Sequence, residues 1–138
     1  MLGFDSSVKI FDQFFKKILF SLMKNNIMDF HPSQIPISKT FVLKDEKDAT
    51  EAAYEMVNIG FTTEDKGFKV LMPKDNERKA KRIGYTVTTT VTYALRQAEQ
   101  DRNVKYWTYH EDEDHYAIVF INHQILEKLG FSLSLIHI

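Results

Sequence analysis

The sequence contains no cysteine among its 138 residues. This absence excludes disulfides, thiolate zinc sites, iron–sulfur clusters and cysteine nucleophiles. An excess of one charge is also lacking, because 18 basic and 19 acidic side chains leave a formal net charge of −1. The charge of the whole chain therefore gives no reason to expect a nucleic acid or a strongly charged partner.

No apolar run is long enough to cross a bilayer. The most hydrophobic stretch, SVKIFDQFFKKILFSLM, is interrupted by Lys9, Asp12, Lys16 and Lys17. These internal charges, and the sequence NNIMDF that follows, also differ from a secretory signal, which needs an unbroken apolar core and a small-residue cleavage site. We therefore expect a cytoplasmic protein without a transmembrane segment.

Recognisable catalytic and cofactor motifs are absent as well. The sequence has no GxSxG, P-loop, GxGxxG or HExxH pattern. We predict no cofactor, assign no catalytic residue and expect a binding protein rather than an enzyme. A small hydrolase whose active site assembles only in space is the third interpretation.

The composition is that of a folded domain. Hydrophobic residues make up 43% of the chain and aromatic residues 13%, with 11 phenylalanines. A chain of this length buries roughly two thirds of the surface that its unfolded form exposes. We predict an α+β domain over residues 35–131, an N-terminal helix with a proline-containing linker over 1–34, and a tail over 132–138.

The N-terminal segment predicts an amphipathic helix over residues 6–24. Ser6 or Ser7 is placed to cap it, and its apolar face carries Phe11, Phe14, Phe15, Ile18 and Leu22. We expect this helix to pack on the domain or on a second copy in a homodimer. Peripheral contact with a membrane surface is the alternative. A third interpretation places the true start at Met23 or Met28 instead of Met1, which would make the helix an over-read.

The middle of the chain predicts a strand, a helix and a second strand. KTFVL predicts the first strand, and Asp45 or Asp48 caps a helix that Gly60 closes. The apolar face of this helix carries Ala49, Ala52, Ala53, Met56 and Val57. Residues 61–73 then predict a strand or a hairpin with its turn at 65–67.

Residues 85–93 fit two structures, because their apolar side chains alternate as in a strand and also continue into a helical stripe. The stripe is formed by Val87, Val91, Ala94, Leu95 and Ala98. We predict a helix over about 87–102. VKYWTY and HYAIVFIN then flank HEDEDH as an antiparallel hairpin, followed by a short helix that ends at Gly130. This order predicts an α+β fold, a ferredoxin-like two-layer sandwich with an N-terminal amphipathic helix.

The hairpin tip HEDEDH is the densest group of side chains that can bind a metal ion. Its candidate ligands are His110, Asp112, Asp114 and His115. Solvated acids are also typical of a tip between two hydrophobic strands, and no other segment clearly supplies supporting groups. We therefore predict no metal and interpret the negative charge as a docking surface.

The run KDNERKAKR concentrates positive charge in Lys74, Arg78, Lys79, Lys81 and Arg82. Such a cluster can contact phosphates, and Tyr106, Trp107 and Tyr109 on a nearby strand could stack on bases. Alternation along that strand sends Tyr106 and Trp107 to opposite faces, however. A solvated helix start or loop is the simpler interpretation of the basic run.

Two stretches share an order of features with a known family. KTFVLKDEKDATEAAYEMVNIGFTT holds a strand and an Ala-rich helix ending in Gly60-Phe61, and VTYALRQAEQDRNVKYWTYHED holds a helix running into Tyr106-Trp107 and acidic residues. This order resembles the RraB family, protein inhibitors of the endoribonuclease RNase E. The residues usually found between that Tyr and Trp are missing here, and only Glu111 to Asp114 stand in for the family's acidic tail. The resemblance implies a ferredoxin-like fold that binds a protein partner and has no catalysis of its own.

The final residues LSLIHI can be encoded by CTG TCT CTT ATA CAC ATC, which resembles the transposon mosaic end used in sequencing libraries. We expect residues 133–138 to be translated adapter on a metagenomic gene fragment, with the natural chain continuing beyond Ser132. An ordinary apolar terminal strand is the alternative.

The favoured function is a small regulatory protein that contacts an unknown protein partner. Its predicted contact residues are Tyr106, Trp107, Tyr109, Glu111, Asp112, Glu113 and Asp114. The alternative is an accessory protein that binds nucleic acid through the basic run at 74–82.

Overall fold

The computed structural model describes Gln13 and residues 31–131. The predicted N-terminal helix at 6–24, apart from Gln13, and the expected adapter tail at 133–138 lie outside the described residues. Residues Pro32–Leu126 form one compact unit, and this unit contains the whole described sheet.

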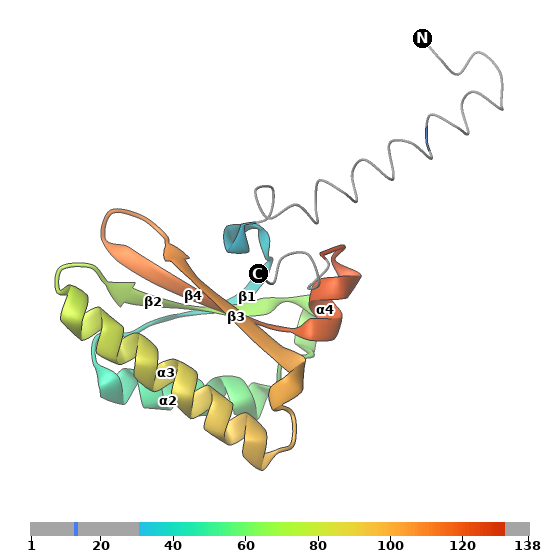
Figure 1. Cartoon of the computed structure of the whole chain (residues 1–138), viewed down its shortest axis with the longest axis horizontal. Coiled ribbons are helices and arrows are strands. Elements are labelled where there is room, and N and C mark those ends of the chain that lie inside the picture. The colour runs from blue at the N-terminus through green and yellow to red at the C-terminus, as the bar shows by residue number, and fades with distance from the viewer. Residues whose placement is uncertain (1–12, 14–30, 132–138) are drawn as a thin grey trace, which may run out of the picture. The chain divides into compact units, whose positions relative to one another are not determined.

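A four-stranded sheet in the order β1-β2-β4-β3 organises this unit (Figure 1). The strands β1, β2, β3 and β4 are Ile37–Val42, Gly67–Pro73, Val104–His110 and His115–Asn122, and the helices α2, α3 and α4 are Glu46–Ile59, Glu77–Gln97 and His123–Lys128. Short 3₁₀ turns occupy Pro32–Gln34, Thr63–Asp65 and Asp101–Asn103.

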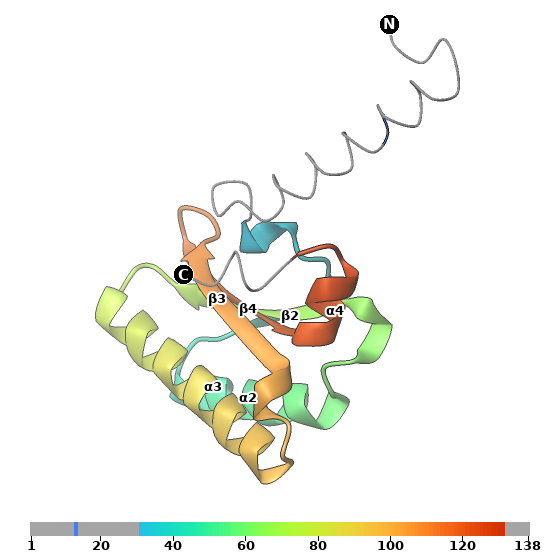
Figure 2. The ribbon, with the colours of Figure 1, turned by 45° about the vertical axis from the view of Figure 1, so that its right-hand side comes forward.

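Both long helices cover the same face of the sheet (Figure 2). β1 and β2 are parallel, whereas β4 is antiparallel to β2 and to β3. The α2 and α3 connections therefore both step in the same direction across the sheet, and crossovers of one handedness then place their helices on one face. The predicted α+β two-layer sandwich is confirmed. Its chain path is β–α–β–α–β–β, with the hairpin last, whereas the hairpin stands in the middle of the standard ferredoxin-like path.

The first long helix follows the predicted signals. Asp45 is its N-cap, and the Asp45 carboxylate accepts a hydrogen bond from the Asp48 backbone N–H at 2.9 Å. Gly60 ends the helix with φ 92°, a conformation that a residue with a Cβ atom adopts only with strain. The predicted bounds of α2 are confirmed.

The second long helix is longer than predicted at its start and shorter at its end. α3 begins at Glu77 instead of about 87, because Asn76 accepts a hydrogen bond from the Lys79 backbone N–H at 3.0 Å and caps it there. The threonines that suggested a strand fit the helix, since Thr89 donates to the Tyr85 carbonyl at 2.7 Å. The strand alternative for 85–93 is wrong, and so is the hairpin alternative for 61–73, where a 3₁₀ turn leads into β2.

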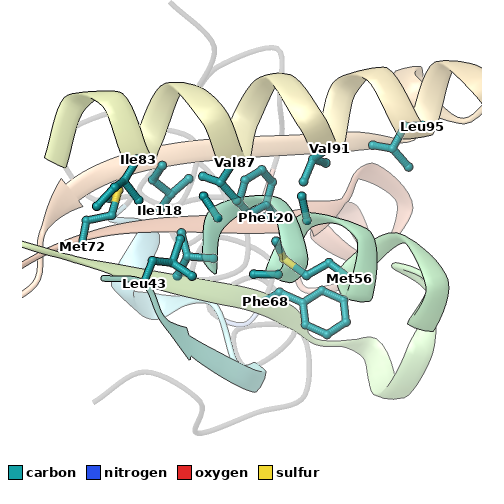
Figure 3. Close-up of a cluster of buried hydrophobic side chains, with 14 of the residues drawn as sticks. Leu43, Met56, Phe68, Met72, Ile83, Val87, Val91, Leu95, Ile118 and Phe120 are labelled. Atoms are coloured by element: carbon teal, nitrogen blue, oxygen red, sulfur yellow. The ribbon is translucent and has the colours of Figure 1, made fainter. Parts of the chain in front are cut away.

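The core lies between the helices and the sheet (Figure 3). The alanines predicted on the buried side of α2 let this helix approach closely, with Ala49, Ala52 and Ala53 at most 5% exposed. Larger side chains fill the rest of the layer, and the fully or almost fully buried ones include Met56, Phe68, Met72, Ile83, Val87, Val91, Leu95, Ile118 and Phe120. Burial of each such side chain contributes about 1.5–3 kcal/mol to folding.

Candidate binding groove and open sheet edge

The strand β3 forms one edge of the sheet, and only β4 pairs with it. The Glu111 backbone N–H donates to the His115 carbonyl at 3.0 Å. The odd-numbered residues of β3 therefore form the backbone hydrogen bonds to β4. Hydrogen bonding alternates along an antiparallel pair. The backbone groups of Tyr106, Thr108 and His110 therefore point away from the sheet.

Bonding on the other side of β4 gives the same assignment. The Lys74 backbone N–H donates to the Asp114 carbonyl at 2.9 Å, so the even-numbered residues of β4 bond to β2 and the odd-numbered ones to β3. Within residues 31–131, no backbone hydrogen bond is made across the outer edge of β3. This edge presents unpaired donors and acceptors to an additional strand.

A groove of about 440 Å³ runs beside this edge, between α3 and the helix-facing side of β3. Met72 and Ile118 form its apolar floor. Gly84 of α3 makes the close packing at the floor feasible, because a Cβ atom there would lie 3.3 Å from Met72 Sδ and 3.6 Å from Ile118 Cδ1. On this face of β3, Val104 packs against the core, whereas Tyr106, Thr108 and His110 are exposed.

Aromatic side chains border the groove on both sides. Tyr85 of α3 is 72% exposed and Tyr106 of β3 is 49% exposed. The Tyr106 ring lies 5.6 Å from the Phe120 ring, and the His110 ring lies 5.2 Å from the Tyr116 ring. Because Tyr106 and His110 rest on ordered rings, they present aromatic surface with little freedom left to lose on binding.

The opposite face of the hairpin carries a polar cluster. Glu111 Oε1 accepts hydrogen bonds from Lys69 Nζ at 3.0 Å and from the Tyr109 hydroxyl at 2.9 Å. Partial burial raises the pKa of Glu111, but these two hydrogen bonds outweigh it and the pKa is lowered. For Lys69, burial lowers the pKa, because it disfavours the charged ammonium. The hydrogen bonds to Glu111 and Tyr109 raise the pKa by more, so the pKa of Lys69 is raised overall. The cluster fixes the end of β3 by charge pairing.

The acidic turn between β3 and β4 is held by its own hydrogen bonds. Asp112 Oδ1 accepts from the Asp114 backbone N–H at 2.8 Å and lies 3.1 Å from His115 Nδ1. The hydrogen bond from Asp114, with the one to His115, lowers the pKa of Asp112. His110 and His115 lie on opposite faces of the sheet. The candidate metal ligands therefore do not converge, and the structure places no group of three or more His, Asp or Glu side chains for a metal ion within the described residues.

The predicted aromatic contact residues are divided between the two faces of β3. Tyr106 faces the groove, as alternation predicts, whereas Trp107 and Tyr109 face the other side. Tyr109 is buried, at 9% exposed, while Trp107 is half-buried. Glu113 is exposed at the turn. Of the three aromatic residues, Tyr106 alone lines the groove.

The basic run at 74–82 does not form one patch. Lys74 Nζ donates to the Asp112 carbonyl at 2.6 Å, so this side chain turns toward the acidic loop. On α3, Lys81 lies 3.7 Å from Glu77 and Arg82 lies 3.5 Å from Glu46. Arg78 is exposed and Lys79 is half-buried on the first turns of the helix. Neighbouring acids offset much of this positive charge.

Sequence reasoning missed the groove and its residues on α3. Tyr85 and Thr88 line it, and Tyr85 could have been assigned to the exposed side of a helix if the start at Glu77 had been recognised from Asn76. The chain matches no family model, no curated protein and no solved structure. Each helix in the described part of the chain is too short or too polar to cross a lipid bilayer.

Proposed function

We propose that this chain is a non-catalytic protein-binding module whose contact site is the α3–β3 groove together with the outer edge of β3. The unpaired backbone groups of Tyr106, Thr108 and His110 carry this proposal. An extended polypeptide segment can pair with such an edge as an added strand, and every second side chain of that segment then points into the groove. Main-chain hydrogen bonds supply affinity, and the groove supplies selectivity.

The chemistry of the groove suits a polypeptide segment with apolar or aromatic side chains. Its floor is Met72 and Ile118, and Tyr85 and Tyr106 stand at its borders. The volume of about 440 Å³ lies within the range of about 300–1,000 Å³ that is usual for binding pockets. Aromatic side chains at a partly solvated surface are typical of protein contact sites.

The resemblance to the RraB family supports the same class of function. The segment that carries the resemblance, Tyr106-Trp107 followed by Glu111 to Asp114, is β3 and the turn after it. Regulation by protein contact in the cytoplasm is the role that this resemblance implies, and the open edge lies in the same segment. We predict only the class of the partner, which is an extended segment of another protein.

Nucleic-acid binding through residues 74–82 has weaker support. Lys81 and Arg82 lie beside acidic side chains, and Lys74 turns toward the acidic loop. A phosphate-binding surface needs unpaired cations that act together. Salt dependence separates the two functions, because phosphate contacts weaken steeply with ionic strength and a mainly apolar protein contact does not.

A library of random peptides displayed on phage, selected on the immobilised full-length chain, tests the proposal. We expect selected synthetic peptides to protect the amides of Tyr106, Thr108 and His110 from hydrogen exchange. Thr108→Pro should weaken peptide binding at least about tenfold, because it removes an outward N–H without breaking a bond to β4.

Thr40→Pro is the matched control, since Thr40 also points its backbone away from the sheet, on the outer edge of β1. It should leave peptide binding unchanged, and circular dichroism should show that both variants are folded. Protection elsewhere on the chain, or equal binding by the two proline variants, would contradict the proposed site.

A further inference from the structure

The outer edge of β3 can pair with a second copy of itself, and an antiparallel register exists that also sets opposite charges against each other. We infer that two copies of this chain pair through their β3 strands, with Thr108 of one copy opposite Thr108 of the other. This inference rests on the proposed function and names one partner for the same edge. This pairing joins the two four-stranded sheets into one continuous sheet. The two copies are then related by a two-fold axis, which gives the assembly closed symmetry.

Backbone geometry selects registers of this kind. Tyr106, Thr108 and His110 direct their donors and acceptors outward, and an added antiparallel strand must set such residues opposite one another. With Thr108 on the two-fold axis, Tyr106 of each copy lies opposite His110 of the other. A shift by one residue would set outward groups against inward ones and leave them unpaired.

Charge distinguishes this register from its neighbour. It places Lys105 of each copy opposite Glu111 of the other, so that two pairs of opposite charges form across the junction. A two-fold axis through Trp107 instead sets Lys105 opposite Tyr109 and forms no such pair. Lys69 of the same copy, 3.0 Å from the Glu111 carboxylate, holds Glu111 in place. In the dimer this carboxylate would face both Lys69 of its own copy and Lys105 of the other copy.

The side chains of β3 also favour pairing over solvation. This strand has an uninterrupted register with β4 over all seven residues and contains no proline, so it has neither a bulge nor a missing donor. On the helix-facing side, Tyr106 is 49% exposed, and pairing would set it beside His110 of the second copy. Self-association therefore closes the same edge that another protein would need, and an external segment must compete with the second copy.

Charged substitutions at Thr108 test the register directly. Thr108 is exposed and its side chain lines the groove, so Thr108→Lys and Thr108→Glu should both fold. Each variant alone places two like charges against each other on the axis. Sedimentation velocity of the full chain should therefore show a dimer dissociation constant at least about tenfold higher than that of the wild type. An equimolar mixture of the two variants should recover the dimer, because Lys and Glu then face each other.

Three results would overturn the inference. The first is a wild-type chain that is monomeric at about 100 μM, well above the micromolar range of ordinary dimers. The second is that the charged variants dimerise as tightly as wild type. The third is that both variants are folded but their mixture does not recover the dimer. Failure of this inference differs from failure of the proposed function. If the chain is monomeric but still binds selected peptides at β3, only the pairing of two copies is refuted. If the chain forms a Thr108-dependent dimer but binds no peptide, the proposed binding of other proteins is refuted.

Discussion

The two edges of the sheet are built differently. At the β1 edge, the register with β2 shifts between Ile37 and Lys39. Lys39 lies over the Phe41 ring, 5.0 Å from its centroid, and forms an ion pair with Glu55 of α2. The β3 edge shows no register shift with β4, and its groove side carries the exposed ring of Tyr106. Within residues 31–131, no ion pair joins this side of β3 to the helix layer.

This difference teaches which edge is available for binding. A bulge and a lysine are common devices that stop an edge strand from pairing with another chain. β1 has both, and its Lys39 pairs with Glu55 of the helix layer. β3 also contains a lysine, Lys105, but its register with β4 has no shift. The regular β3 edge is therefore the one that we propose for binding.

The largest expected effect concerns what holds each edge strand to the core. Phe120 is 1% exposed and lies beneath Tyr106 of β3. We expect Phe120→Ala to lower the free energy of unfolding by about 3–5 kcal/mol through the cavity that it leaves. Phe41 of β1 is only partly buried, so Phe41→Ala should cost about 1–2 kcal/mol. Urea denaturation followed by circular dichroism measures both, and equal losses would show that the two edges are anchored alike.

A smaller effect should appear in the pH dependence at the β3 end. The pKa of Glu111 is lowered in the folded chain, so its contribution is present above the ordinary value of 4.5 and is lost as pH falls through the lower folded value. The raised pKa of Lys69 gives a contribution that is lost only as pH rises through a value above 10.5. Because water screens the partly exposed pair, we expect Glu111→Gln to cost about 1 kcal/mol or less at pH 7.

That cost should shrink as the pH falls through the lowered pKa of Glu111, because the wild-type carboxylate then also becomes neutral. Unfolding midpoints in urea between pH 3 and pH 8 provide the measurement. Glu55→Gln is the control at the β1 edge, where the ion pair is exposed on both sides and should contribute about 0.5 kcal/mol or less. A Glu111→Gln cost that is the same at pH 3 and pH 7 would rule out the ion pair as its source.

Removing the protection of β1 should make the two edges more alike. Lys39→Val deletes a charge from the edge strand and a contact with Glu55, which should change the free energy of unfolding by about 0.5 kcal/mol. It should also raise aggregation at high protein concentration, because a β-branched residue without charge favours pairing at an edge. Light scattering during incubation measures this, and an unchanged signal would mean that the register shift alone protects β1.

The smallest expected change in stability tests the groove. Tyr85 and Tyr93 both lie on α3 and are 72% and 59% exposed, but only Tyr85 lines the groove. Substitution of either by serine should leave the free energy of unfolding within about 0.5 kcal/mol. Tyr85→Ser should weaken binding of the selected peptides, measured by calorimetry, whereas Tyr93→Ser should not. If both substitutions weaken peptide binding equally, the peptide contacts α3 outside the groove.

The sequence was sufficient for α2 and insufficient for the start of α3, for physical reasons. Asp45, Gly60 and the alanines of α2 are local signals that act within one turn of the helix. The first buried residues of α3 are Ala80, inside the basic run at 74–82, and Ile83, directly after it. The threonines after them fit a strand equally well by propensity. Burial against the sheet decided the structure, and that information is not local.

The binding groove was less predictable than the strand that borders it. Alternation correctly placed Tyr106 and Trp107 on opposite faces of β3. The open edge, however, depends on β4 pairing with β2 as well as with β3, and the groove floor depends on Gly84 approaching Met72. Both features join segments far apart in the chain, and no spacing within one segment reports them.

The position of β4 in the sheet governs when the domain can fold during its own synthesis. Among the four described strands this one is last in chain order but lies between β2 and β3, so the ribosome must release residues 115–122 before β3 has its neighbour in this sheet. Until then β3 has no partner strand in the described sheet, and the edge of β2 that faces β4 stays open to chaperones and to other nascent chains. Late pairing of distant strands is slow because loop closure precedes the contacts that reward it. The sheet should therefore be completed only after residues 115–122 have left the exit tunnel.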